Sequence, residues 1–254
     1  PIIKMMKNVK IVLVSKALIS FLLLIMVLSS GVYAFHSLYY ESVFIAGISM
    51  APTLNGAEDH ANEATVDFGI IDNHKIALKH IKRFDIVSTY YPDETDYDLN
   101  TNTLKKDARK KIKRVIALPN ETFEIKKGLL YVLNDEKFEL VKYPFKTIPE
   151  DMSNFTEKDT GGSITLAANE YWVLGDNRQN SHDSATINKP VKYSNLLGVL
   201  VAIEGTGTLY IKHYRCSNCE KKFNEDVTVC DECGNTVLPV YDLKNKQYIW
   251  PKYF

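Results

Sequence analysis

The sequence of 254 residues lacks an excess of charge of either sign, because 31 lysines and arginines balance 31 aspartates and glutamates. Proteins that bind nucleic acid usually carry a basic excess, so we expect no nucleic-acid partner. Charged residues are also absent from residues 17–40, and cysteines are absent outside residues 216–233. The overall composition, with 45% hydrophobic residues, is that of a folded chain and excludes a disordered one. These uneven distributions predict three parts, residues 1–40, 41–213 and 214–254.

The charge-free stretch has the length and composition of a membrane-spanning helix. A helix over residues 17–40 is about 36 Å long, and the hydrocarbon core of a bilayer is roughly 30 Å thick. Lysines precede this stretch, and Glu41 is the first acidic residue after it. The positive-inside rule then places the N-terminus in the cytoplasm and the chain from residue 41 outside the cell membrane. A cleaved signal peptide ending near Ala34 is the alternative, although its apolar region is longer than usual.

The middle part of the chain shows short runs of β-branched and aromatic residues in place of long helical periodicity. Turn-forming residues end several of these runs, as at Pro119 and Asn120. We therefore predict a mainly β domain. Its expected strands lie in residues 84–88, 112–118, 129–132, 170–174 and 197–203. Residues 92–111 are expected to form an exposed loop, and residues 134–165 a small inserted cap.

Four segments follow the predicted anchor in a characteristic order. Residues 47–54, 84–87, 112–119 and 175–184 contain GISMAPTL, FDIV, IKRVIALP and GDNRQNSHDS. Together with the anchor they resemble type I signal peptidase, the membrane-bound serine protease that removes signal peptides. The resemblance implies a β-rich catalytic domain and a reaction that needs no cofactor. It also implies signal-peptide-bearing preproteins as substrates, with membrane lipid and the secretion machinery as partners.

The resemblance assigns Ser49 as the nucleophile and Lys113 as the general base. A serine hydroxyl is a weak nucleophile and needs a neighbouring base that is neutral near pH 7. Lysine, with a usual pKa of about 10.4, meets this condition only where burial or nearby positive charge lowers that pKa. The acyl-enzyme mechanism expected from the family would use the backbone N–H of Ser49 as an oxyanion donor.

Further positions in the matched segments have supporting roles by resemblance. Ser181 is expected to hydrogen-bond Lys113 and orient it, while Asp183 and Asp176 hold loops in place. Asp176 is equally well explained as an ordinary turn residue. Met50 follows the nucleophile, and Gly47 stands where some family members add a serine hydroxyl to the oxyanion hole.

The chain departs from the family pattern at four of its supporting positions. Ala185 replaces the arginine that is expected to pair with Asp183. Ala117 and Asn120 replace glycines, and Phe84 stands where glycine is common. These departures concern the geometry of loops more than the Ser–Lys dyad.

There are two alternatives to the dyad. A Ser–His–Asp triad is disfavoured because His182 and Asp183 are adjacent and would face opposite sides of an extended strand. The other histidines considered, His60, His74 and His80, lie in no recognisable motif. The alternative from a different class is a catalytically inactive, membrane-tethered zinc-ribbon protein.

The four cysteines form two CxxC pairs. Two such pairs can close a tetrahedral Zn²⁺ site that leaves no open position for a catalytic water. We therefore expect a structural zinc ribbon in residues 214–254, whose glycine after the second pair suits a tight turn. A pair of disulfides is the alternative, because the predicted location is outside the cytoplasm. The expected ligands are Cys216, Cys219, Cys230 and Cys233.

Overall fold

The computed structural model describes residues 2–57, 63–93, 96–101, 103–106, 108–144 and 158–253, with side chains described at Lys16 and from Leu18 onward. Residues 145–157 of the expected cap lie outside the described residues, as does His60. The chain divides into two compact units after Glu41, and each unit is considered by itself.

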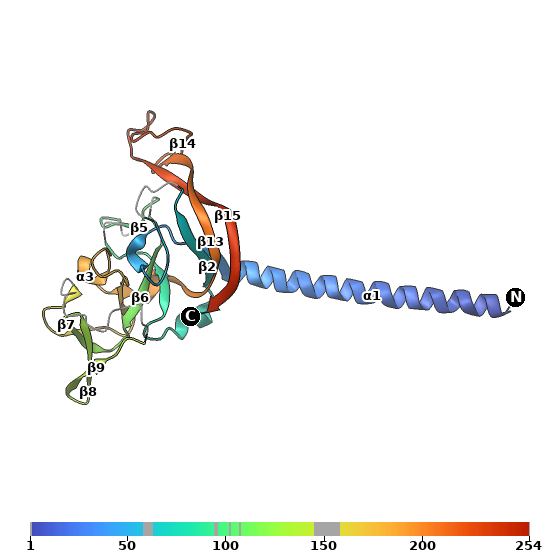
Figure 1. Cartoon of the computed structure of the whole chain (residues 1–254), viewed down its shortest axis with the longest axis horizontal. Coiled ribbons are helices and arrows are strands. Elements are labelled where there is room, and N and C mark those ends of the chain that lie inside the picture. Colours follow the sequence, from blue (N-terminus) through green and yellow to red (C-terminus); the bar gives the residue numbers. More distant parts are fainter. Residues whose placement is uncertain are drawn as a thin grey trace. The chain divides into compact units, whose positions relative to one another are not determined.

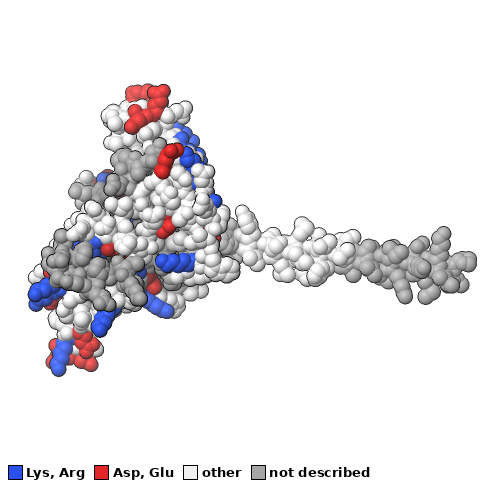
Figure 2. Space-filling model, viewed as in Figure 1, with Lys and Arg blue, Asp and Glu red and all other residues white. Residues whose placement is uncertain are grey.

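Helix α1 (Ile2–Tyr39) forms the first unit. Its stretch Leu18–Tyr39 has a mean hydropathy of 2.3 and is long and apolar enough to cross a membrane. No charged side chain interrupts this stretch, which is white along the face seen in Figure 2. The hydroxyls of Ser29 and Ser30 each donate to the carbonyl three residues earlier, which satisfies them within the helix. The predicted apolar helix is therefore present.

A nine-stranded sheet builds the second unit (Figure 1). Its strand order is β1 (Tyr40–Phe44), β2 (Thr65–Asp72), β13 (Leu196–Cys216), β3 (Ile86–Thr89), β6 (Lys111–Ala117), β11 (Glu170–Leu174) and β12 (Val191–Lys192). Strands β14 (Lys222–Phe223) and β15 (Val237–Tyr253) also pair with β13. The mainly β fold predicted from the sequence is confirmed. The expected strand at residues 170–174 has the bounds of β11.

The central strands β3, β6 and β11 carry hydrophobic cores on both of their faces. Val115 of β6 packs with Val87 and Val173 in one buried cluster, while the next residue, Ile116, packs with Trp172 and Leu174 in another. The second cluster includes residues of a four-stranded sheet. This sheet has the order β10 (Ile164–Thr165), β7 (Thr122–Lys126), β8 (Leu129–Asn134) and β9 (Lys137–Val141). Burial on both faces explains the apolar runs at residues 115–117 of β6 and 171–174 of β11.

Short elements fill the connections between these strands. The expected loop at residues 92–111 contains a small hairpin, and its Asp96 is buried and accepts hydrogen bonds from Tyr91 N at 2.7 Å and from Lys111 Nζ. The short elements are the 3₁₀ turns η1 (Ile48–Met50) and η3 (Tyr193–Asn195), helices α2 (Lys75–Lys79) and α3 (Ser184–Ile187), and strands β4 (Tyr97–Asp98) and β5 (Thr103–Leu104).

Strands β13 and β15 form a long ribbon that carries the cysteines at its end (Figure 1). Their pairing runs from Ala202 with Tyr253 to Cys216 with Val237, and β2 pairs along the opposite edge of β13. Only the beginning of β13 matches the strand expected at residues 197–203. The expected boundary at residue 214 falls inside β13.

Candidate active site

Ser49 lies at the middle of the 3₁₀ turn η1, which is fixed from two sides. Met50, the next residue, is 1% exposed and packs with Ile45 and Leu54 in a buried cluster. From the other side, Asn177 donates its backbone N–H to Ser49 O at 3.0 Å and its side-chain amide to Ile48 O at 3.2 Å. The turn therefore presents the Ser49 hydroxyl from a rigid position.

Lys113 extends from β6, between β3 and β11, and reaches Ser49 across the sheet. The distance from Lys113 Nζ to Ser49 Oγ is 2.6 Å, and Lys113 Nζ also donates to Ile112 O at 3.0 Å. Lys113 is 3% exposed. The structure thus brings together two residues that stand 64 positions apart in the chain, the serine and lysine that the sequence analysis paired.

Burial lowers the pKa of Lys113 from 10.5 to about 8. Within this net shift of the pKa, the carboxylates of Asp183 and Asp176 act against burial, while the cations of Lys111 and Lys158 act in the same direction as burial. Burial dominates because an ammonium loses its hydration when water is removed around it. A lysine with this pKa is partly neutral near pH 7 and can accept a proton.

Ser181 lies close to the turn that carries Ser49. A Cβ atom placed on Gly175 would come within 2.2 Å of Ser181 Oγ and 2.4 Å of Ser49 O, so glycine alone fits between them. The expected hydrogen bond from Ser181 to Lys113 is not formed. Among the described residues, the buried Ser181 Oγ has no hydrogen-bond partner. The role of Ser181 in orienting Lys113 stays a prediction.

Asp176 belongs to a buried ion pair instead of forming only a turn. Arg114, the residue after Lys113, donates from Nε to Asp176 Oδ1 at 2.8 Å and from Nη2 to Asp176 Oδ2 at 2.6 Å. The arginine side chain is 4% exposed and the aspartate side chain 0%. A bidentate pair of this kind fixes both partners in orientation. It ties β6, next to the proposed base, to the segment that follows β11.

Asp183 is buried too, and its cation comes from a residue that the sequence analysis did not identify. Lys158 Nζ lies 3.1 Å from Asp183 Oδ1, 2.7 Å from Ser181 O and 2.8 Å from Thr186 Oγ1. Asp183 also caps helix α3 and accepts the backbone N–H of Gly175 at 3.1 Å. Lys158 follows a long polar stretch with no motif around it, so no signal in the sequence pointed to it.

The chain is similar in sequence to known proteins. Residues 15–203, about three quarters of the chain, match the family described as signal peptidase, peptidase S26. The chain belongs to this signal peptidase family. Signal peptidase I V of Bacillus subtilis (strain 168) is 30% identical over 61% of this chain and 80% of its own length. Signal peptidase I of Bacillus caldolyticus is 29% identical over 57% of this chain and 69% of its own.

Another relative and one solved structure carry the same name. Signal peptidase I P of Bacillus subtilis subsp. natto is 29% identical over 72% of this chain and 81% of its own length. A crystal structure of a signal peptidase I from Enterococcus faecalis V583 is 24% identical, covers 47% of this chain and 96% of its own, and has a TM-score of 0.28. The resemblance noted in the sequence is confirmed, and with it the class of the enzyme, a signal-peptidase-type serine endopeptidase.

Two of the departures from the signal peptidase pattern keep a glycine-like backbone. Phe84 has a φ of 76° and Asn120 a φ of 64°, in the left-handed region that favours glycine. Asn tolerates this conformation, whereas for an aromatic residue it costs free energy of order 1–3 kcal/mol. Phe84 is held there by its backbone: its N–H donates to Val115 O at 2.8 Å and its carbonyl accepts from Arg114 Nη1 at 2.8 Å.

Two of the histidines considered for a triad, His182 and His74, have other partners. His182 is half exposed, lies 3.9 Å from Asp93 through Nε2 and packs edge-on against Tyr91. His74 caps helix α2 by accepting the backbone N–H of Ile76 at its Nδ1. These contacts give each imidazole a structural explanation that does not involve Ser49.

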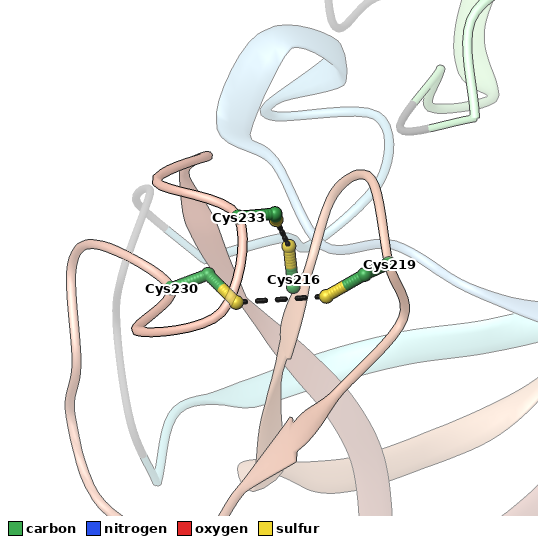
Figure 3. A group of neighbouring side chains, drawn as sticks. All are labelled: Cys216, Cys219, Cys230 and Cys233. Atoms are coloured by element: carbon green, nitrogen blue, oxygen red, sulfur yellow. Dashed lines mark hydrogen bonds between the residues drawn. The ribbon is translucent and has the colours of Figure 1, made fainter.

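The four cysteines converge from two loops at the end of the β13–β15 ribbon (Figure 3). Their sulfur atoms all lie within 4.8 Å of one another. Cys216 and Cys233 are 3.4 Å apart, and Cys219 and Cys230 are 3.5 Å apart. These separations are much longer than a disulfide bond of about 2.05 Å. The arrangement suits four thiolates around one tetrahedral ion, which fits the chemistry of zinc.

Proposed function

We propose that this enzyme removes signal peptides from secreted preproteins, with Ser49 as the nucleophile and Lys113 as the general base. The observation that carries the proposal is the 2.6 Å distance between Lys113 Nζ and Ser49 Oγ in a buried site. A nucleophile within hydrogen-bond reach of a base with a matched pKa is the arrangement that acyl transfer needs.

The reaction follows from this pair. The neutral amine of Lys113 takes the proton of Ser49 as its Oγ attacks the scissile carbonyl, and the carbonyl electrons move onto oxygen. The backbone N–H of Ser49 stabilises this oxyanion. The tetrahedral intermediate then collapses, the C–N bond breaks, and Lys113 returns the proton to the leaving amine. Water attacks the resulting ester with Lys113 again as base, which releases the new carboxylate and restores Ser49.

The surroundings and substrate class are part of the same proposal. The apolar stretch Leu18–Tyr39 spans the cell membrane with the N-terminus in the cytoplasm, and the catalytic unit acts on preproteins at the outer face. The substrates are signal peptides with small residues at positions −1 and −3. Membrane lipid and the secretion machinery are the other partners. Catalysis needs no cofactor.

A preprotein-cleavage assay tests the dyad. We expect Ser49→Ala and Lys113→Ala each to abolish cleavage, while matched substitutions of the exposed Ser163 and Lys212 leave it intact. Cleavage by Ser49→Ala at the wild-type rate would reject the mechanism. A wild-type chain that cleaves no signal peptide would instead favour the inactive, membrane-tethered zinc-ribbon protein.

We further propose that the four cysteines hold one structural Zn²⁺. The spacing of the sulfur atoms supports this, as does the hydrogen bond from the backbone N–H of Asn218 to Cys216 Sγ at 3.4 Å. Gly234, with a φ of 69°, provides the tight turn after the second pair and donates its N–H to Cys230 O at 2.9 Å. The ion would close the end of the ribbon without taking part in the cleavage.

Metal analysis separates zinc from disulfides. We expect one zinc per chain after purification without reducing agent, and four reactive thiols once the metal is chelated. A metal-free protein with no titratable thiols would contradict the zinc site. A Cys219→Ser, Cys230→Ser double variant serves as the control, because it removes one ligand from each CxxC pair.

A further inference from the structure

Lys158 occupies an environment that is unusual for a lysine. It is 5% exposed, and its ammonium makes three hydrogen bonds, to Ser181 O, Asp183 Oδ1 and Thr186 Oγ1. An ammonium has three donors, so all of them are used. A lysine buried to this degree is rare, and removal of its charge would leave Asp183 buried without a counter-ion.

The acceptors of Lys158 lie in the segment that borders the dyad. Ser181 Oγ and Ser49 O both lie against Gly175, within 2.4 Å of the position that a Cβ atom would take there, and the Gly175 N–H donates to the second oxygen of Asp183. A shift of the Asp183 carboxylate would therefore move Gly175. Because Gly175 is packed closely against Ser49 O, this movement would also displace the backbone of Ser49. The ammonium of Lys158 is thus connected to the nucleophile through close contacts.

We propose that Lys158 is a positioning residue of the catalytic centre, whose ammonium neutralises the buried Asp183 and holds the Ser181–Asp183 turn against the dyad. The proposal rests on the assignment of Ser49 and Lys113 as the dyad. Ala185 stands where the family pattern has the arginine that pairs with Asp183. Lys158, 25 positions before Asp183, supplies that cation instead.

The charges around Lys113 give the proposal a specific consequence. The charged groups that shift the pKa of Lys113 are Asp183, Lys111, Lys158 and Asp176. Asp176 is paired with Arg114 and Lys111 with Asp96, so Lys158 is the cation that balances Asp183. Without it, the Asp183 carboxylate favours the protonated form of Lys113 and raises its pKa. The base then becomes neutral only at higher pH.

The test compares Lys158→Met and Lys158→Arg in the full-length enzyme, with the pH dependence of preprotein-peptide cleavage as the readout. For Lys158→Met we expect kcat at pH 7 to fall about tenfold and the midpoint of the acid limb to move about one unit toward higher pH. KM should stay within about twofold, because Lys158 is not placed against the substrate. Lys158→Arg retains the charge and should restore the wild-type midpoint. The exposed Lys212→Met is the matched control.

A double variant keeps the test decisive if Lys158→Met does not fold. Lys158→Met with Asp183→Asn removes both charges and leaves no unpaired ion in the core, so its midpoint should return close to the wild-type value. A wild-type midpoint in Lys158→Met, with or without a loss of kcat, overturns the proposal. Failure of the dyad itself would appear separately, as cleavage by Ser49→Ala.

Discussion

The lowered pKa of Lys113 makes a quantitative prediction about the pH dependence of the enzyme. With a pKa of about 8, roughly one tenth of Lys113 is neutral at pH 7 and about nine tenths at pH 9. A lysine with its ordinary pKa of 10.5 would be neutral about 300-fold less often at pH 7. Because the reaction needs the neutral amine, we expect kcat/KM to rise about tenfold from pH 7 to pH 9.

Cleavage of a fluorogenic signal-sequence peptide by the full-length enzyme in detergent measures this profile directly. The rise should have a single midpoint near pH 8, and unfolding curves at each pH ensure that the enzyme remains folded. Lys113→Arg is the control, because a guanidinium stays protonated throughout this range and should give no activity at any pH. A flat profile between pH 7 and pH 9, or a midpoint above about pH 10, would refute the assignment of a buried Lys113 as the base.

Three more predictions follow from the site. Gly47→Ser should raise kcat roughly tenfold in the same assay, because a Cβ at Gly47 meets nothing within 4 Å and its hydroxyl can add an oxyanion donor. Asp176→Asn should lower the free energy of unfolding by about 3–5 kcal/mol in urea, because it leaves Arg114 charged and buried, whereas the exposed Asp242→Asn should cost less than about 1 kcal/mol. Lys113→Met should gain stability relative to wild type at pH 7, and this advantage should shrink by about 3 kcal/mol between about pH 8 and pH 10.5.

The sign of the last prediction follows from proton linkage. The pKa of Lys113 is lower in the folded chain than in the unfolded one, so the unfolded chain binds the extra proton between about pH 8 and pH 10.5. Below this pH window Lys113 is protonated in both the folded and the unfolded chain, so the folded chain bears the full cost of burying the ammonium. The wild-type enzyme therefore gains stability as the pH rises through the window. Urea unfolding at pH 7 and at pH 10.5 measures the difference, and an equal difference at both would contradict it.

Local composition and short motifs account for what could be predicted from the sequence. The apolar helix follows from an uninterrupted run without charge, and β6 and β11 follow from buried runs of branched and aromatic residues. Ser49 and Lys113 were identified because four segments occur in the order of a known family, and not because either residue is distinctive alone. Any serine or lysine taken by itself is more often a turn or surface residue.

Interactions between distant segments account for what the sequence could not show. Glycine residues usually weaken or end a strand. Strand β13 nevertheless continues through Gly205 and Gly207, because β2 and β15 pair with its two edges. A Cβ at Gly205 would lie 2.1 Å from Gln247 O, so glycine permits the close approach of β15. Likewise, a lysine in a polar stretch predicts a solvated side chain, and only the fold places Lys158 beside Asp183.

The pairing of charges in the core explains how Lys113 can be neutral beside two carboxylates. Asp176 is engaged by Arg114 and Asp183 by Lys158, while the hydrogen bonds of Lys113 Nζ go to a hydroxyl and a carbonyl. A carboxylate that is already paired with a cation attracts a second one weakly, so burial sets the pKa of Lys113. Arg114 and Lys158 thus act as counter-ions that neutralise the carboxylates of Asp176 and Asp183. The neutral form of Lys113 depends on these two ion pairs as much as on the burial of its side chain. If either cation is lost, we expect the unpaired carboxylate to stabilise the protonated form of Lys113.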